Sequence, residues 1–248
     1  MPLRHDDQIV IGHGSGGRLT RDLVEKFFKP YLSNPPLSEG NDFARVGIPP
    51  SISKDGQLAV STDAHIVSPL FFPGGDIGRL SVCGTVNDVS MSGAQPLYIT
   101  AGFILEEGFP IASLAKILAS MQAAAAEADI QVVAGYTKVV EKGKADGIFI
   151  TTSGIGWITG GHRIAGDQAK PDDVVIISGN LGDHGIAVLA ARGELGFETE
   201  VVSDVAPLNK MIQQLLAAAP HTHVLRDPTR GCLLYTSDAA DALLCLYP

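Results

Sequence analysis

Apolar positions follow two different spacings along the chain, which predicts a mixture of helices and strands. From Leu19 to Tyr31 apolar side chains recur at four-residue spacing, and the alanine-rich stretch at 110–128 keeps one apolar side, as expected for helices with one buried face. Short apolar runs at 58–67 and 96–105 are bounded by glycine, proline or polar residues and predict buried strands. The chain is therefore predicted to be an α/β protein.

Further elements are predicted by the same reasoning, and their order is irregular. Strands are expected at 8–11, 130–140, 147–158 and 174–178, and helices at 77–91, 183–191 and 208–218. Asp76 is expected to cap the helix that stops at Gly93. The strands at 130–140 and 147–158 are expected to pair with each other around a turn at 142–144. This order favours a mixed sheet with packed helices over a doubly wound parallel sheet.

A polar, turn-rich stretch at 159–171 predicts a boundary between domains. We expect an N-terminal domain at 1–160 and the incomplete start of a second α/β domain at 165–231. Residues 232–248 have the character of a non-native tail, similar to translated adapter sequence, so the chain is expected to be a truncated form; a natural short helix is the alternative interpretation.

Composition and charge narrow the classes of function. With 45% hydrophobic and 18% charged residues the chain is globular, and its net charge of −9 argues against binding nucleic acid. No apolar run approaches the roughly 20 residues that span a bilayer, so no membrane association is expected. The three cysteines, Cys83, Cys232 and Cys245, are too few and too scattered for a disulfide framework, which predicts a cytoplasmic setting. Cys83 is expected to be a small core residue.

A glycine-rich loop near the N-terminus could bind phosphate. Residues 12–17 read Gly-His-Gly-Ser-Gly-Gly and lead directly into a predicted helix, so bare amides could face phosphate oxygens. The loop matches neither the dinucleotide fingerprint nor the phosphate loop that ends in Gly-Lys-Ser/Thr. A flexible turn is the alternative interpretation.

Two aspartates are the candidate metal ligands. Asp63 lies in an apolar strand, where a carboxylate is costly to bury without a cation or strong donors. Asn87 and Asp88 lie inside a predicted helix, although both residue types are poor there, which suggests contact with a ligand. Asp63 and Asp88 together suit magnesium, which takes few carboxylates and completes its shell with water and phosphate. Lys138 could reach phosphates or be merely solvated, and His65 is expected to be structural.

Several motifs in order resemble one family. They are HGSGG at 13–17, STD at 61–63, GTVND at 84–88, TKVV at 137–140, GDHG at 182–185 and RDPTRG at 226–231. The series resembles the HypE family of hydrogenase maturation proteins, which act as carbamoyl dehydratases within the PurM-like (aminoimidazole ribonucleotide synthetase-like) group. The resemblance implies a mixed α/β PurM-like fold.

The resemblance also implies an activity and its partners. The reaction would be ATP-dependent dehydration of a carbamoyl group carried on a C-terminal cysteine, giving a thiocyanate that supplies cyanide to nickel–iron hydrogenase. The N-terminal domain would pair with its copy in a homodimer and hold ATP and Mg²⁺ near the domain and subunit junctions. Further partners would be other maturation proteins, namely the carbamoyltransferase and the iron–cyanide scaffold proteins.

Site residues carry over from the resemblance by position. It implies that Asp63 and Asp88 bind magnesium, that Gly14, Ser15, Gly16 and Gly17 lie along the phosphates, that Asn87, Thr137 and Lys138 line the nucleotide site, and that Asp183 and His184 shape the second domain's part of the cleft.

Two features depart from the family pattern. Tyr136 stands where the family has an aspartate, and a phenol stays protonated near neutral pH, so Tyr136 is expected to weaken magnesium–ATP binding. The acceptor cysteine is absent, since the residues around Cys245 do not match the family's ending, and no catalytic residue is assigned. We therefore expect this chain to bind nucleotide and dimerise at most.

Two alternatives remain open. One is another PurM-like ATP-using enzyme of the selenophosphate synthetase or thiamine-monophosphate kinase type. The other is a non-catalytic module for dimerisation and partner binding.

Overall fold

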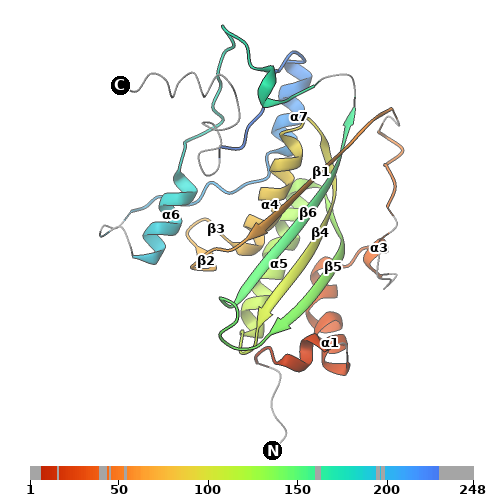
Figure 1. Ribbon diagram of the computed structural model, residues 1–248, viewed down its shortest axis with the longest axis vertical. Coiled ribbons are helices and arrows are strands. Elements are labelled where there is room, and N and C mark those ends of the chain that lie inside the picture. The colour runs from red at the N-terminus through yellow and green to blue at the C-terminus, as the bar shows by residue number, and fades with distance from the viewer. Residues whose placement is uncertain are drawn as a thin grey trace, which may run out of the picture.

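The protein is built around one four-stranded sheet with two long helices on one of its faces (Figure 1). The computed structural model describes residues 7–15, 17–38, 44, 46–52, 55–159, 163–193, 196 and 199–228. The strands are β1 (Gly56–His65), β4 (Gln95–Glu106), β5 (Gln131–Val140) and β6 (Ile148–Thr159), and the covering helices are α4 (Ile77–Ser90) and α5 (Ile111–Ala128). A separate two-stranded ribbon pairs β2 (Phe71–Phe72) with β3 (Gly75–Asp76).

The sheet is mixed, as predicted. Its strand order is β1-β6-β4-β5, with β6 antiparallel to both neighbours and β5 parallel to β4. The expected pairing of 130–140 with 147–158 is wrong, because β4 lies between β5 and β6. The crossover through α5 places β5 beside β4, and the turn after β5 crosses two strand spacings, about 10 Å, to reach β6. In this position β6 is central and pairs along both edges.

Alternation along each strand separates a helix-facing side from an outer side. On β4, Ile99, Phe103 and Leu105 are buried against the helices, whereas Ile104 on the opposite side is partly exposed. From α5, the fully buried Leu114, Ile117, Leu118 and Met121 fill the same layer. These predicted elements are confirmed, including the cap of α4: Asp76 Oδ1 accepts from Gly78 N at 2.7 Å and Arg79 N at 3.2 Å. The helices thus cover one face of the sheet only.

At the N-terminus the expected strand at 8–11 does not form. Within the described residues this segment makes a single bridge, Gln8 to Pro110, and the backbone of Ile9 bonds to Phe109 and Gly108 at the start of α5. The predicted helix at 19–31 is confirmed, although its turns change type along its length. The segment runs through η1 (Ile11–Gly14), α1 (Arg18–Leu23), the π-helical η2 (Val24–Phe28), α2 (Lys29–Leu32) and α3 (Pro35–Ser38).

In the C-terminal part α6 (Asp183–Arg192) and α7 (Asn209–Ala218) are confirmed, and a short turn, η3 (Gly166–Gln168), precedes them. The expected strand at 174–178 is wrong, because this apolar segment has no pairing partner among the described residues and its side chains are exposed. Across the described part of the chain, every helix is too short or too polar to traverse a lipid bilayer.

Residues 199–208, which we call the strap, connect the region of α6 to α7 and pass the β2–β3 ribbon. Ser203 N donates to Pro73 O at 2.8 Å, and Gly74 lies against it with a positive φ of 90°. A Cβ on Gly74 would stand 2.5 Å from Ser203 O, so glycine is required for this approach. The strap then reaches α4, where it meets Asn87.

Candidate nucleotide and metal site

Asp63 lies on β1 and faces helix α4. It is partly buried, and its Oδ1 accepts a hydrogen bond from the amide of Ala64 at 2.7 Å. The other oxygen is directed at the helix, since a Cβ placed on Gly84 would lie 3.8 Å from Asp63 Oδ2. The strand therefore holds one carboxylate oxygen on its own backbone and presents the second to the seam between β1 and α4.

Asp88 belongs to the same seam. It follows Gly84 by one helical turn, so both positions share one side of α4. Ser61, which shares the side of β1 with Asp63, donates from its hydroxyl to Asp88 Oδ2 at 3.1 Å. The structure thus brings the two candidate magnesium ligands to one strand–helix seam, with Asp88 at its exposed end.

The donor set of this seam fits magnesium. It offers two carboxylates and a hydroxyl, and magnesium binds in proteins through one or two carboxylates while water and phosphate oxygens supply the rest. The residues that the structure describes contain no cluster of three or more histidine, cysteine or acidic side chains that could hold a metal alone. A divalent cation held by the two carboxylates would take its remaining ligands from water and phosphate, as in a magnesium–nucleotide site.

Asn87, beside Asp88 in sequence, points elsewhere. It is buried, its Nδ2 donates to Ala206 O at 3.0 Å, and its Oδ1 accepts from Leu208 N at 2.8 Å. These two bonds fasten the strap to α4 and offset the poor helix propensity of asparagine. The structure does not bring Asn87 into the seam with Asp63, and its assignment to the nucleotide site stays a prediction.

The glycine loop lies beside β5. A Cβ on Gly14 would stand 2.7 Å from Val139 N, so only glycine allows the loop to approach the strand this closely. Ser15 Oγ donates to Gly12 O at 3.0 Å, and Gly17 has open space around its Cα. Gly16 falls outside the described residues. The loop is thus next to the residue that follows Lys138.

The β5 candidates lie on two sides of the strand. Tyr136 pairs with Gly102 and Lys138 with Ile104, which places both on the outer side of the sheet, while Thr137 pairs with Phe103 on the opposite side. Tyr136 is 69% exposed. Because β5 and β1 are the two edges of the sheet, three strand spacings, or about 14 Å, separate Lys138 from Asp63. One chain therefore does not bring the glycine loop and Lys138 together with the aspartate seam.

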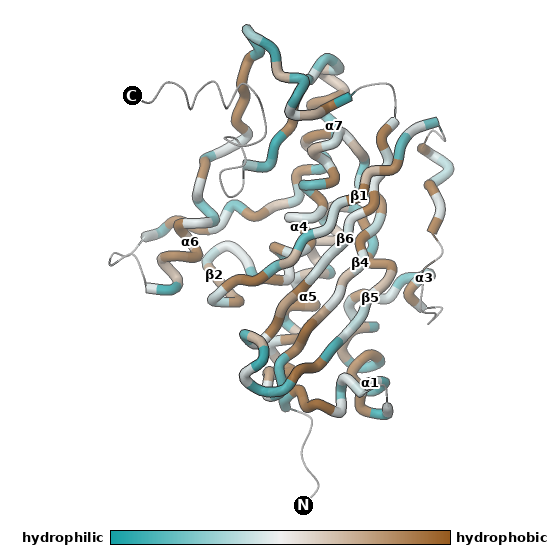
Figure 2. Tube along the Cα trace, in the orientation of Figure 1, coloured by the Kyte–Doolittle hydropathy of each residue, from teal (hydrophilic) through white to brown (hydrophobic). Residues whose placement is uncertain are grey.

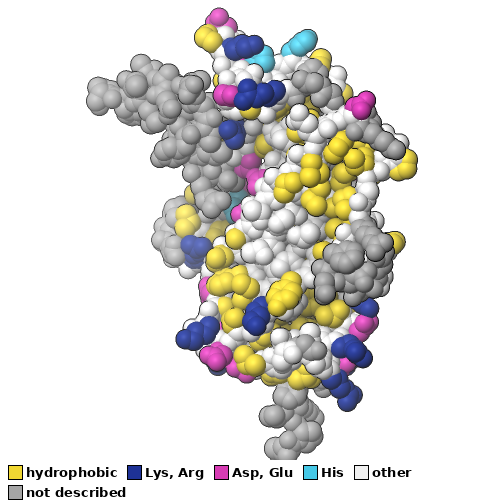
Figure 3. Space-filling model, turned by 45° about the vertical axis from the view of Figure 1, so that its right-hand side comes forward, with side chains coloured by type: hydrophobic (Ala, Val, Ile, Leu, Met, Phe, Trp, Pro, Cys, Tyr) yellow, Lys and Arg dark blue, Asp and Glu magenta, His cyan; other side chains and the backbone are white. Residues whose placement is uncertain are grey.

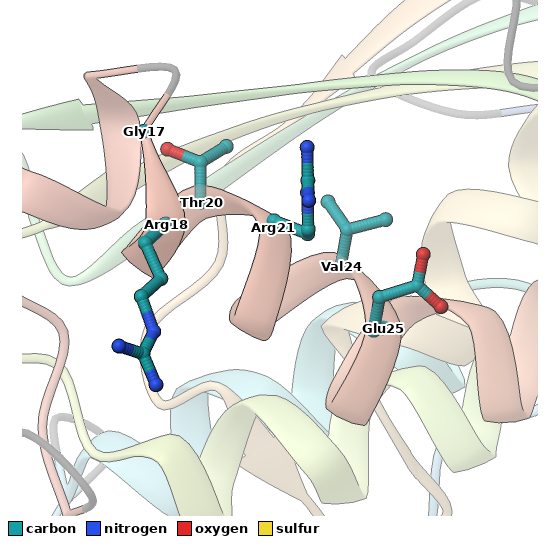
Figure 4. A pocket seen from close by; sticks show the side chains of 6 residues that line it. All are labelled: Gly17, Arg18, Thr20, Arg21, Val24 and Glu25. Atoms are coloured by element: carbon teal, nitrogen blue, oxygen red, sulfur yellow. The ribbon is translucent and has the colours of Figure 1, made fainter.

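A hollow of about 590 Å³ lies at the start of α1, after the glycine loop. It is lined by Gly17, Arg18, Thr20, Arg21, Val24 and Glu25. In Figure 4 the side chains of Thr20, Arg21 and Glu25 point to one side of the helix, and that of Arg18 points away from them. Arg18 and Arg21 are not among the predicted site residues, although two cations in the first helical turn after a glycine loop are visible in the sequence.

Asp183 and His184 open α6. Asn180 Nδ2 donates to Asp183 Oδ2 at 3.1 Å, and His184 Nδ1 lies 2.9 Å from Ser203 Oγ in the strap. The His184 ring packs edge-on against Phe72 with centroids 5.3 Å apart. Burial lowers the pKa of His184, and the charge of Asp204 opposes this in part. These contacts join α6 to the β2–β3 ribbon, and a role in the cleft stays a prediction.

Comparison with known proteins identifies matching families. The model for the AIR synthase related protein, N-terminal domain, matches residues 40–158, and that for the corresponding C-terminal domain matches residues 170–237. The chain is 53% identical over 221 residues to carbamoyl dehydratase HypE of Azotobacter vinelandii, covering 89% of this chain and 63% of that relative. The chain thus spans less than two thirds of that relative's length.

Two solved structures are also similar. A crystal structure of the hydrogenase maturation protein HypE in complex with ATP superposes with a TM-score of 0.85 at 48% identity, covering 91% of this chain and 65% of that one. A structure of a HypE–HypF complex matches with a TM-score of 0.69 at 51% identity, covering 86% of this chain and 67% of that one.

Proposed function

Because the chain belongs to the HypE family of AIR synthase related proteins, we propose that it serves the ATP-dependent dehydration of a protein-bound S-carbamoyl group to a thiocyanate. The thiocyanate would supply a cyanide ligand for nickel–iron hydrogenase. The observation that carries the proposal is the meeting of Asp63 and Asp88 in one seam, in a chain similar to a HypE that binds ATP.

The proposed chemistry removes a poor leaving group. The carbamoyl oxygen attacks the γ-phosphorus of ATP and ADP leaves; the nitrogen then loses its protons as phosphate departs with the oxygen, and a carbon–nitrogen triple bond forms. A magnesium ion supplies charge neutralisation at the phosphates. Asp63 and Asp88 would hold that ion, and the amides of the glycine loop with Lys138, which one chain alone does not bring to the seam, would orient the phosphates across a dimer.

The outer face of the sheet supports a homodimer. Among the residues that the structure describes, no helix covers this face in Figure 1, and Figure 2 follows the hydropathy along its strands. Leu58 and Val60 on β1 are 60% and 65% exposed there, and Figure 3 shows hydrophobic side chains gathered on the surface. Contiguous exposed apolar surface is typical of an interface. A second copy facing this sheet in the opposite sense would bring its β5, with Lys138, toward the β1 edge of the first.

A further partner is proposed from the HypE–HypF complex, in which a relative binds another maturation protein. We extend this to the carbamoyltransferase that loads the substrate and to the iron–cyanide scaffold proteins that accept the product. The proposed setting for these encounters is the cytoplasm.

Nucleotide binding tests the proposal. Calorimetric titration with a non-hydrolysable ATP analogue, adenylyl imidodiphosphate, should show binding that magnesium strengthens and EDTA weakens. Asp63→Asn should lose the magnesium effect, whereas Asp129→Asn, a surface change at the end of α5, should retain it. A folded dimer that binds no nucleotide would instead favour the non-catalytic module, which the exposed Tyr136 in place of an aspartate also favours.

A further inference from the structure

Three buried polar side chains line the inner end of the seam that holds Asp63. His65 on β1, Thr85 on α4 and Thr152 on β6 are 5%, 0% and 1% exposed, and we call them the buried row. Thr152 Oγ1 lies 3.0 Å from His65 Nε2 and 2.5 Å from Thr85 Oγ1. The same hydroxyl is 3.4 Å from Ser81 O, to which it donates. One hydroxyl therefore joins two strands to the helix.

The row continues directly into Asp63. His65 is two residues further along β1, so both side chains face α4, and Asp63 pairs with Thr152 in the sheet. His65 Nε2 is 3.8 Å from Asp63 Oδ2. Since Oδ1 is bonded to the Ala64 amide, the imidazole edge stands beside the one oxygen that is directed at the helix. Rotation of this carboxylate is limited by the strand backbone on one side and by His65 on the other.

Gly84 makes room for the imidazole. A Cβ at this position would lie 3.1 Å from His65 Cε1, closer than ordinary contact. A glycine inside a helix costs about 1 kcal/mol relative to alanine, so its place in the middle of α4 needs a packing reason. His65 provides one, because the ring fills the space that an alanine methyl group would take.

Packing alone does not require these side chains to be polar. A hydrogen-bonded buried group contributes little net free energy, and apolar residues of the same shape can be equally stable. Valine has the shape of threonine and would fill the positions of Thr85 and Thr152 without a hydroxyl. The polarity of the buried row therefore points to a task beyond filling the core.

We propose that His65 is a positioning residue that, held by Thr152 and Thr85, keeps the free oxygen of the Asp63 carboxylate turned toward α4 for the divalent cation. This inference rests on the proposed function. Side chains around a metal ligand commonly fix its orientation, and their loss weakens metal affinity by roughly 10–100-fold.

The test separates metal affinity from nucleotide affinity and from folding. Magnesium is titrated into the full chain with adenylyl imidodiphosphate, and binding is followed by calorimetry for the wild type, His65→Leu and His65→Gln. Nucleotide affinity in EDTA and the melting temperature are measured alongside. Glutamine can place its amide nitrogen near the position of Nε2, so it serves as the conservative rescue.

We expect His65→Leu to raise the half-saturating magnesium concentration about tenfold or more, with nucleotide affinity in EDTA unchanged and with His65→Gln close to the wild type. Thr152→Val removes the hydroxyl that holds His65, keeps the side-chain shape, and should give a smaller shift in the same direction. This variant keeps the inference testable if His65→Leu does not fold.

Three outcomes would overturn the inference. If His65→Leu folds and has the same half-saturating magnesium concentration as the wild type, His65 does not act on the metal site. Equal losses of affinity with magnesium and with EDTA assign His65 to packing of the nucleotide site instead. If magnesium does not change nucleotide binding by the wild-type chain, both the proposed metal function and this inference fail. Failure of the proposed function is therefore distinguishable from failure of the role of His65 alone.

Discussion

Replacement of Asn87 by alanine tests whether the hydrogen bonds of this residue stabilise the attachment of the strap to α4. The change removes the donor to Ala206 O and the acceptor of Leu208 N, which leaves two backbone groups of the strap without their partners. Each unsatisfied buried group costs about 1–3 kcal/mol, so the expected loss of stability for the two groups is about 2–6 kcal/mol. Water entering beside the strap would place the loss near the lower end.

Thermal unfolding followed by circular dichroism measures this loss. For a chain of this size 1 kcal/mol corresponds to about 2–4 °C, so the melting temperature of Asn87→Ala should fall by roughly 4–24 °C. The control is Gln122→Ala on the exposed side of α5, which should have the same melting temperature as the wild type. Asn87→Asp keeps an acceptor for Leu208 N but sets a carboxylate oxygen against Ala206 O, and its melting temperature should fall at least as far as that of Asn87→Ala.

A contrary result is equally specific. If Asn87→Ala has the same melting temperature as Gln122→Ala and yet binds adenylyl imidodiphosphate more weakly, the hydrogen bonds to the strap contribute little to stability. Asn87 would then act on the nucleotide, as its motif predicts from the sequence.

Three further predictions concern other parts of the molecule. Tyr136→Asp should tighten nucleotide binding in magnesium and leave binding in EDTA unchanged; equal affinities of the two chains would contradict the expected effect of the phenol. Val60→Lys should convert the proposed dimer to monomer in sedimentation velocity, since an exposed apolar position on the outer face becomes charged, and a persistent dimer would place the interface elsewhere. Burial raises the pKa of the Cys83 thiol from 9.0 to about 12, so site-resolved mass spectrometry should find it unmodified by iodoacetamide in the native chain at neutral pH and modified in urea. Because the folded state keeps this proton, Cys83 stabilises the fold below pH 9 and that contribution is lost as pH rises toward 12; Cys83→Ala should flatten this part of the stability curve, and an unchanged slope would contradict the assignment.

Elements with strong local signals were predictable from the sequence. The apolar runs of β1 and β4, the apolar side of α5 and the capping aspartate of α4 all agree with the structure. The apolar run at 174–178 failed because a strand requires a pairing partner, which local sequence does not supply. Strand order failed for the same reason, since the position of β4 between β5 and β6 is a long-range property.

The candidate site divides in a similar way. The sequence predicted that Asp63 and Asp88 meet, and residue types that are costly in their local setting carried that signal. The orientation of the Asn87 side chain could not be predicted from the sequence, because its hydrogen-bond partners Ala206 and Leu208 are more than a hundred residues away along the chain. The separation of Lys138 from Asp63 could not be predicted either, because it depends on the order of the strands in the sheet.

The central claim, that Asp63 and Asp88 share one divalent cation, is tested most directly by a double-mutant cycle on magnesium affinity. Asp63→Asn, Asp88→Asn and the double variant are titrated with magnesium in the presence of adenylyl imidodiphosphate. If both carboxylates hold the same ion, the second substitution costs much less than the first, with a coupling of about 0.5–3 kcal/mol. Strictly additive losses, or a loss from one aspartate only, would contradict a shared cation.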